Sequence, residues 1–540
     1  MCPKPPPLFV REATGLVKEA SAFDIFQFNT ISVAGVQMVP PWVLLVPFIG
    51  APVLPSLVIA GAGAAVIAAM YYILAISMPR SGGDYVFGSR LLHPLAGIFA
   101  GAMSGVLLGI VNGAWGATTW VPTALSPLLT YLGATWNNPG LMNIASTVSR
   151  PLYFGAMAAV VTAVFALILM AGMRRYFIIQ NVLCTVSIVA QFAMIGVLAA
   201  TDPNTFTQAF NGFLTSFNLS HNGIISTAQR LGWASPAAVS MALAFQAGPA
   251  VYGSMFWVEF STSLGGEIKR VRRSQLIGIV GCLLFWTALT YTTFLLMVNM
   301  VGYQFLSAHD YLVLVHPEGL GTLPAVPGYL LYIMVAARNP ILAIFFAIGI
   351  IAGTIPTVSW ALILFSRSIF AMSFDRVLPS FLADINDKLH SPVKTLTICS
   401  VFLFAWVLVG FLPQAASYVT YFGVAQGFLL VMTFIVVGAG AMVFPYLKKS
   451  LYETTIPKIL RRNILGVPLL SMLGFAALVF NLQDAYYLMS YPLYYGITPQ
   501  FLGTLVGAAV FAFGAYGVAK IYRQRQGIDI SLLFKDLPPE

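Results

Sequence analysis

Charged side chains are scarce in this sequence. Asp, Glu, Lys and Arg make up 8% of its 540 residues, whereas hydrophobic residues make up 59%. A soluble domain carries about a quarter charged residues, so these few charges cannot cover a water-exposed surface. The apolar stretches are long enough to cross a bilayer as helices, which takes about 20 residues. They do not alternate over about 10 residues as the strands of a membrane barrel do. The sequence therefore predicts an all-α membrane protein.

The ligand sets of several enzyme classes are also missing. The five histidines lie in loops or at the ends of apolar stretches, so they offer no haem or copper site within the membrane. The sequence has no Walker-type phosphate loop for ATP and no intramembrane His–Glu motif of a metalloprotease. Of the four cysteines, Cys184, Cys282 and Cys399 sit in apolar stretches and predict no disulfide framework. We therefore expect no enzyme activity, no metal site and no cofactor.

We predict about twelve membrane spans. A polar, proline-rich segment, 1–21, precedes them and lacks the features of a cleavable signal peptide. An apolar piece at 324–337 is too short for a span, so we place it outside the membrane as a re-entrant or capping helix. The predicted spans are 23–49, 53–78, 94–132, 152–173, 176–200, 236–261, 276–300, 340–366, 393–411, 415–445, 466–482 and 500–519.

The basic residues divide unevenly between the two sides of these spans. All 27 lysines and arginines lie on the side of both termini, except Arg150, Arg230 and Arg338. Cytoplasmic loops are enriched in Lys and Arg, so both termini are predicted to be cytoplasmic in a multi-pass protein of the cell (plasma) membrane. The net charge of +10 is then a topology signal. We expect membrane lipid, and no nucleic acid, as a partner.

The third span carries a glycine at every fourth position from Gly97 to Gly113. Small residues at this spacing let helix backbones approach one another closely. We therefore expect this stripe to pack against neighbouring helices and assign it no ligand.

Two of the predicted spans look interrupted. The first span reads FNTISVAGVQ from Phe28 and is followed by Pro40-Pro41; the sixth reads QAGP from Gln246 and then YGSMFWVE from Tyr252. Glycine and proline free backbone groups that lipid cannot satisfy, so such backbone is tolerated only where it is buried or lines a cavity. Simple proline kinks are the alternative. Two broken spans that lie five apart are typical of inverted-repeat transporters.

This spacing predicts the organisation of the chain. A cytoplasmic segment, 1–21, precedes a first repeat at 22–200 (spans 1–5), and a second repeat follows at 236–445 (spans 6–10). Two appended spans occupy 466–522, and a cytoplasmic tail occupies 523–540.

Several stretches next to the spans carry family motifs. They read PRSGGDY from Pro79 with Ser89-Arg90, GEIK from Gly266 with Arg272-Arg273, SRSIFAM from Ser366 with DRVLP from Asp375 and SPV from Ser391, and FPY from Phe444. In this order the stretches resemble amino acid permeases of the amino acid–polyamine–organocation superfamily. The resemblance implies a LeuT-like five-plus-five fold, alternating access and secondary active transport of amino acids.

The sequence also departs from the family pattern. The break in the first span holds one glycine, Gly35, where many of these permeases are glycine-rich. Some proton-coupled relatives have a lysine in span 5 facing span 1, and the matching position here is Ser187. Proton coupling through a lysine is therefore not expected.

A zwitterion is the expected substrate. Unwound helix ends offer free N–H groups to a carboxylate and carbonyl groups to an ammonium. Asp484, Tyr486 and Tyr487 are interpreted as exposed loop residues, so no second acid is expected near the breaks and neutral amino acids are favoured. The predicted substrate-binding residues are Thr30, Ser32, Val33, Ala34, Gly35, Gly253, Ser254, Phe256 and Trp257.

Glu259 is the acidic residue that lies deepest in a span. A carboxylate there is costly and rarely faces lipid, so we predict a proton-carrying or gating role, which the resemblance also implies. A structural hydrogen bond at the break is the alternative. Asp24 is expected to cap the first span or to pair with a basic loop residue. Arg80 and Asp84 are expected either to latch the cytoplasmic gate or to have a plain surface role.

The coupling ion is left open between H⁺ and Na⁺. Hydroxyls and freed carbonyls suit a monovalent cation, and Thr354, Thr357 and Ser359 of the eighth span flank Pro356. A Na⁺-coupled or uncoupled exchanger of amino acids or polyamines is thus an alternative to a proton symporter. A channel or a membrane-embedded enzyme is a further class. A channel is disfavoured because the sequence has no repeated filter and no charge ring.

Overall fold

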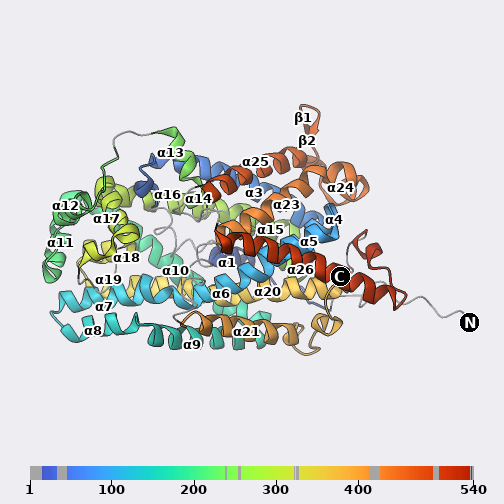
Figure 1. The fold of residues 1–540 in the computed structure, drawn as a ribbon, viewed down its shortest axis with the longest axis horizontal. Helices are drawn as coiled ribbons and strands as arrows, with labels where there is room; N and C mark the ends of the chain where they lie inside the picture. Colours follow the sequence, from blue (N-terminus) through green and yellow to red (C-terminus); the bar gives the residue numbers. More distant parts are fainter. Residues whose placement is uncertain are drawn as a thin grey trace, which may run out of the picture.

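The computed structural model describes residues 15–32, 45–236, 240–252, 257–321, 323, 328–412, 426–490, 498–535 and 537. Helices form almost all of this part of the chain, as Figure 1 shows. The strands named within these ranges are β1 (Asn463–Ile464) and β2 (Val467–Pro468), which form an antiparallel hairpin. The prediction of an all-α membrane protein is confirmed.

Nine helical segments among the described residues are long and apolar enough to cross a membrane. Five consist of one helix each: α3 (Val53–Ser77), α9 (Pro151–Met170), α10 (Met173–Ala200), α25 (Leu469–Ser490) and α26 (Pro499–Gln524). A sixth, α23 (Gln426–Leu447), follows undescribed residues. The other three are composite: α5 (Pro94–Ala100), η1 (Gly101–Leu107), α6 (Leu108–Thr118), η2 (Val121–Leu125) and α7 (Ser126–Thr135); α15 (Val271–Gln275), η6 (Leu276–Gly281) and α16 (Cys282–Val301); and α19 (Pro340–Thr354) with α20 (Thr357–Phe374). All nine segments coincide with predicted spans.

The three remaining predicted spans are shorter or only partly described. The first contains α1 (Ala22–Ser32), and the ninth is α21 (Val393–Val409), which is apolar but shorter than the nine. The sixth consists of α13 (Met241–Gln246), α14 (Gly248–Tyr252) and the 3₁₀-helix η4 (Trp257–Ser263). The count of twelve spans and the inverted repeat stay predictions.

Shorter helices connect and cap the long ones. α18 (Tyr329–Ala337), in the apolar piece that was placed outside the membrane, has 9 residues and is too short to span. The others are α4 (Asp84–Leu91), α8 (Pro139–Val148), α11 (Pro203–Leu214), η3 (Thr215–Phe217), α12 (His221–Arg230), η5 (Gly265–Glu267), α17 (Tyr303–Val315), η7 (Pro317–Leu320), η8 (Ser380–Ala383), α24 (Lys449–Thr455), η10 (Lys458–Leu460) and η11 (Ile530–Phe534).

The long helices run roughly along the longest axis of the molecule (Figure 1). The C-terminal part of α26 lies at the right of that view, together with α4 and α24; we call this the termini end. The helices α11, α12 and α17 gather at the opposite end, which we call the far end. Positions along this axis are described below by their distance from the termini end and the far end.

The eleventh span differs from its prediction. It was expected to end at residue 482, but α25 continues to Ser490 and contains Asp484, which is 0% exposed. The reason is that Ala477, Ala485 and Leu488 continue the buried stripe of the helix, and Asp484 lies on the same stripe. The interpretation of Asp484 as an exposed loop residue was wrong.

The glycine stripe of the third span packs as expected. A methyl group at Gly109 would lie 2.9 Å from Cβ of Phe365 and 3.0 Å from the carbonyl oxygen of Ala361, both on α20. A methyl group at Gly113 would lie 2.7 Å from Cδ2 of Leu403 on α21. Glycine therefore lets the third span approach α20 and α21 without overlap.

This packing predicts that Gly109→Ala destabilises the protein by about 1–3 kcal/mol, because the backbone of α20 has to move. Thermal unfolding of the purified protein in detergent measures the effect. Gly507→Ala on α26 is the matched control, since no heavy atom lies within 4 Å of an added methyl group there. Equal unfolding temperatures for the two variants would contradict the packing argument.

Candidate functional site

The buried side chain of Asn29 joins three segments. Its Nδ2 donates to Oγ of Ser261 on η4 at 3.0 Å and to the carbonyl oxygen of Gly278 on η6 at 2.8 Å. Its Oδ1 accepts from the backbone N–H of Ser261 at 3.1 Å. One amide thus satisfies a backbone N–H of the sixth span and a backbone carbonyl of the seventh. Sequence reasoning did not single out Asn29, although a buried Asn in an apolar helix is a recognisable signal.

Two of the predicted substrate-binding residues meet directly. The helix α1 ends at Ser32, whose hydroxyl donates to the carbonyl oxygen of Asn29 at 2.7 Å and to that of Trp257, the first residue of η4. The last described residue of α1 and the first of η4 therefore share one hydrogen bond, which we call the Ser32–Trp257 junction. The predicted residues Val33, Ala34, Gly35, Gly253, Ser254 and Phe256 lie outside the described residues.

Aromatic rings surround this junction on the side of α20. The Trp257 ring lies 6.4 Å from Trp360, and Phe260 meets Trp360 edge-on at 4.9 Å. Trp257 is 8% exposed, so it lies within the protein rather than at the lipid surface. This wall can contact the apolar part of a ligand at the junction.

Thr30 faces a different neighbour. Its Oγ1 accepts from Nε1 of Trp286 on α16 at 3.0 Å. It is thus engaged with the seventh span, on a different side of α1 from the Ser32–Trp257 junction. Its assignment to the substrate site stays a prediction.

Glu259 lies within η4, two residues after Trp257. It is 0% exposed, and neither carboxylate oxygen has a hydrogen-bond partner among the described residues. Tyr71, Asp84 and Tyr252 lie within electrostatic range of it. Because an unpaired charge is costly in such surroundings, the neutral, protonated carboxyl is favoured.

The candidate cation ligands of the eighth span are mostly occupied within their own helices. The Thr354 hydroxyl donates to the carbonyl oxygen of Ile350 at 2.7 Å. The Ser359 hydroxyl donates to the carbonyl oxygen of Pro356 at 2.9 Å. Of the three candidate ligands, only Thr357 has a buried hydroxyl, Oγ1, without a partner among the described residues. Thr354 and Ser359 thus show the ordinary back-bonding of hydroxyls within helices.

Two buried ion pairs close the termini end. Arg90 on α4 binds Asp375 through two hydrogen bonds, of 2.6 and 2.8 Å, and Arg367 on α20 binds Glu267 on η5 at 2.6 and 3.0 Å. All four side chains are almost fully buried. We call these two pairs the latch. Each of the four residues lies in a motif that suggested the family resemblance.

Arg80 and Asp84, which were predicted to latch the cytoplasmic gate, make contacts outside these two ion pairs. The Tyr71 hydroxyl donates to Oδ1 of Asp84 at 2.6 Å, so this acid is paired with a tyrosine. Burial raises the pKa of Asp84, which lies between two membrane spans, although the bond from Tyr71 acts in the opposite direction. The Arg80 side chain donates to the carbonyl oxygen of Pro79 at 3.2 Å.

Polar contacts fix the start of α1 to α10. Asp24 accepts from the backbone N–H of Ser21 at 2.8 Å, so its predicted capping role is confirmed. Its other oxygen accepts from Nδ2 of Asn181 at 2.6 Å, so its partner between helices is an amide and not a basic residue. Deeper along α10, the Ser187 hydroxyl donates to the carbonyl oxygen of Gly349 at 2.7 Å.

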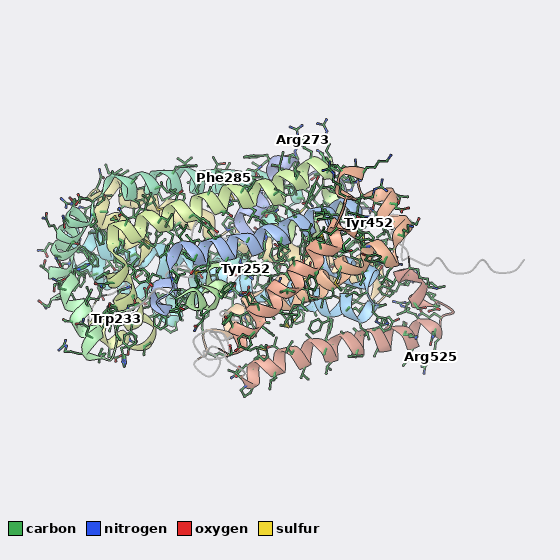
Figure 2. All side chains as sticks on the ribbon, turned by 90° about the horizontal axis from the view of Figure 1, so that it is seen from above. Trp233, Tyr252, Arg273, Phe285, Tyr452 and Arg525 are labelled. Carbon is green, nitrogen blue, oxygen red and sulfur yellow. The ribbon has the colours of Figure 1, made fainter. Side chains whose placement is uncertain are left out.

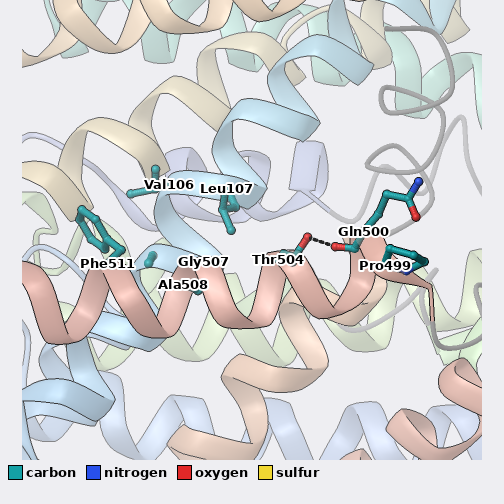
Figure 3. Close-up of a pocket in the computed structure, with 10 residues that line it drawn as sticks. Val106, Leu107, Pro499, Gln500, Thr504, Gly507, Ala508 and Phe511 are labelled. Atoms are coloured by element: carbon teal, nitrogen blue, oxygen red, sulfur yellow. Dashed lines mark hydrogen bonds between the residues drawn. The ribbon is translucent and has the colours of Figure 1, made fainter.

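A cavity lies away from this junction. It has a volume of about 600 Å³ and lies between α26 and η1, as Figure 3 shows. Val106, Leu107, Ala508 and Phe511 make it largely apolar, and the Thr504 hydroxyl donates within α26 to the carbonyl oxygen of Gln500. None of the predicted site residues lines it.

One comparison with known proteins identifies a family. The family model described as "Amino acid permease" matches residues 25–506, from the start of α1 into α26. No curated protein matches the sequence. The matched region contains Asn29, the Ser32–Trp257 junction and the latch. The match confirms the resemblance to the amino acid–polyamine–organocation superfamily, and the chain belongs to the amino acid permease family, as a multi-pass membrane protein that transports amino acids.

Proposed function

We propose that this protein is a secondary active transporter that moves neutral amino acids across the plasma membrane by alternating access. The Ser32–Trp257 junction supports the proposal, because the described ends of two interrupted spans meet at one buried hydroxyl. In a five-plus-five fold, such ends border the substrate site. Repeats at 22–200 and 236–445, appended spans at 466–522 and twelve spans in all complete the proposed arrangement. The termini end faces the cytoplasm in this proposal.

A zwitterion fits the chemistry proposed for the breaks. Helix ends carry partial charges that bind a carboxylate and an ammonium. Trp257, together with the proposed contact Phe256, would enclose an apolar side chain. A neutral preference requires that the buried acids Glu259 and Asp484 are protonated, because a charged carboxylate there would favour a second ammonium group.

We therefore expect the purified protein in proteoliposomes to take up neutral apolar amino acids in preference to arginine, lysine or diamines. Uptake from a mixture of radiolabelled amino acids, each competed with unlabelled compound, identifies the class. Trp257→Ala should weaken uptake by about tenfold or more through lost aromatic contact, whereas Trp136→Ala, at an exposed side chain, should not. Preferential uptake of a dibasic compound would contradict the neutral preference, and no amino acid uptake would contradict the function.

Proton coupling through Glu259 is the favoured coupling mechanism. Its burial without a partner supports proton binding, and Ser187 leaves no lysine for the alternative route. A Na⁺-coupled or uncoupled exchanger of amino acids or polyamines is the second candidate, and the unpartnered hydroxyl of Thr357 is the observation that favours a cation.

Proton coupling predicts that wild-type uptake rises as the external pH falls from 8 to 6 and is independent of Na⁺. Glu259→Gln imitates the protonated form and should abolish this pH dependence. Thr357→Val serves as the comparison, because it removes the candidate cation ligand and should leave the pH profile unchanged. Identical pH profiles for wild type and Glu259→Gln would rule out the Glu259 role, and steep Na⁺ dependence that Thr357→Val removes would support the second candidate.

Alternating access also requires a gate that stays closed on one side, and the latch is proposed to be that gate. Removing one partner of a buried ion pair costs about 3–5 kcal/mol, whereas an exposed pair contributes about 1 kcal/mol or less. Arg90→Ala should therefore lower the thermal unfolding midpoint strongly. Lys394→Ala, which removes the exposed pair with Asp384, should lower it little. Similar shifts for both variants would show that the latch does not hold the closed form together.

A further inference from the structure

A second buried acid lies beside the sixth span, outside the set of residues assigned above. Asp484 on α25 is 0% exposed, and neither of its carboxylate oxygens has a hydrogen-bond partner among the described residues. An unpaired charge at such a position is strongly disfavoured. The carboxyl must therefore hold a proton or meet a cation during the transport cycle.

The neighbours of Asp484 place it next to the interrupted helix. It faces α14 at Gly248, where a methyl group would lie 3.7 Å from Oδ1 of Asp484. One turn away on α25, Oδ1 of Asn481 accepts a hydrogen bond from the Tyr252 hydroxyl at 3.4 Å. Tyr252 is the last residue of α14 and lies within electrostatic range of both Asp484 and Glu259.

The three groups occur in order along the molecule. The chain runs from α13 through α14 to η4 and then to Glu267 of the latch, so Gly248 lies farther from the termini end than Glu259 does. Figure 2 shows Tyr252 in the interior, between Trp233 near the far end and Arg525 near the termini end. Asp484, Tyr252 and Glu259 thus follow one another from the far end toward the latch.

The row continues beyond Glu259. Tyr71 lies within electrostatic range of Glu259 and donates to Asp84, which is beside the loop that leads to the latch. Tyr252 lies within electrostatic range of Asp484 and of Glu259. Asp84 also lies within electrostatic range of Glu259. The buried arginines Arg90 and Arg367 each form an ion pair with an acid outside this row, Asp375 and Glu267.

A proton suits Asp484 better than a larger cation. Asp484 lines neither the cavity between α26 and η1 nor the one lined by Arg80 and Asp375. A proton needs no cavity, whereas an ammonium group or a hydrated metal ion needs space and several oxygen ligands. Asn481 supplies one amide oxygen and Tyr252 one hydroxyl. A hydroxyl can accept one proton and release another, which suffices for proton transfer.

We propose that Asp484 is a second proton-binding site, which is loaded from the far end and delivers its proton through Tyr252 to Glu259. This inference rests on the proposed proton coupling. The O–H bond of Asp484 breaks, Tyr252 accepts that proton and releases its own hydroxyl proton, and Glu259 forms the new O–H bond. Charge is conserved, and no redox partner is needed.

Proteoliposomes containing a pH-sensitive dye test the route. The wild type should acidify the lumen when a transported amino acid is added outside, and one unit of pH gradient should support about tenfold accumulation for one coupled proton. Asp484→Asn should lose this accumulation and the acidification. It should keep substrate counterflow within about twofold of wild type, because exchange needs no net proton transfer. Tyr252→Phe should slow acidification with counterflow preserved.

The matched control is Asp202→Asn, which removes an acid at an exposed helix N-cap while keeping a capping oxygen. It should behave as wild type. Asp484→Glu restores a carboxyl group and should recover acidification, which separates proton binding from a structural role.

Each outcome decides the proposal. If Asp484→Asn acidifies the lumen like wild type while Glu259→Gln does not, the Asp484 step is wrong and the proposed coupling stands. If counterflow and acidification fall together in Asp484→Asn and Asp484→Glu does not recover them, Asp484 has a structural role and the proposal fails. If the wild type transports no amino acid, the proposed function itself fails.

Discussion

The hydrogen bonds of Asn29 are the contact on which the arrangement of the site depends. A helix that is interrupted inside a membrane leaves backbone groups that lipid cannot satisfy. Asn29 accepts a hydrogen bond from the backbone N–H of Ser261 on one side and donates one to the carbonyl oxygen of Gly278 on the other. Ser261 in turn donates to Oε1 of Gln275 at 2.7 Å, so the network reaches α15. This network lets η4 depart from α-helical geometry while it stays buried.

The buried charged groups of the molecule follow two different rules. At the termini end, each carboxylate of the latch has an arginine in bidentate geometry, so both charges persist and bind parts of the chain that lie far apart in the sequence. Along the sixth span, Glu259 and Asp484 have no such partner among the described residues. A paired acid keeps its charge and holds a structure together, whereas an unpaired buried acid favours its protonated form. The difference separates groups suited to gating from groups suited to carrying protons.

Much of the fold could be predicted because its signals are local. About twenty consecutive apolar residues indicate a membrane span whatever surrounds them. The spacing of the glycines in the third span alone indicates close helix packing. The residues that break helices in the first and sixth spans are local signals too, although the contact between Ser32 and Trp257 joins residues 225 apart in the chain. The partners of Asn29 could not be predicted in this way, because Ser261 lies 232 residues away in the chain.

Asp484 shows where such reasoning stops. Its neighbours Gln483, Tyr486 and Tyr487 lower the local hydropathy, so a window of residues places the end of the span before it. Burial depends instead on which face of α25 meets α14 and α23, and that face includes both Asn481 and Asp484. On α14 the carboxylate of Asp484 meets Gly248, where a methyl group would lie 3.7 Å from Oδ1. The helix thus buries the polar residues Asn481 and Asp484, and this is the pattern expected where a membrane protein accepts a cost in stability for a function.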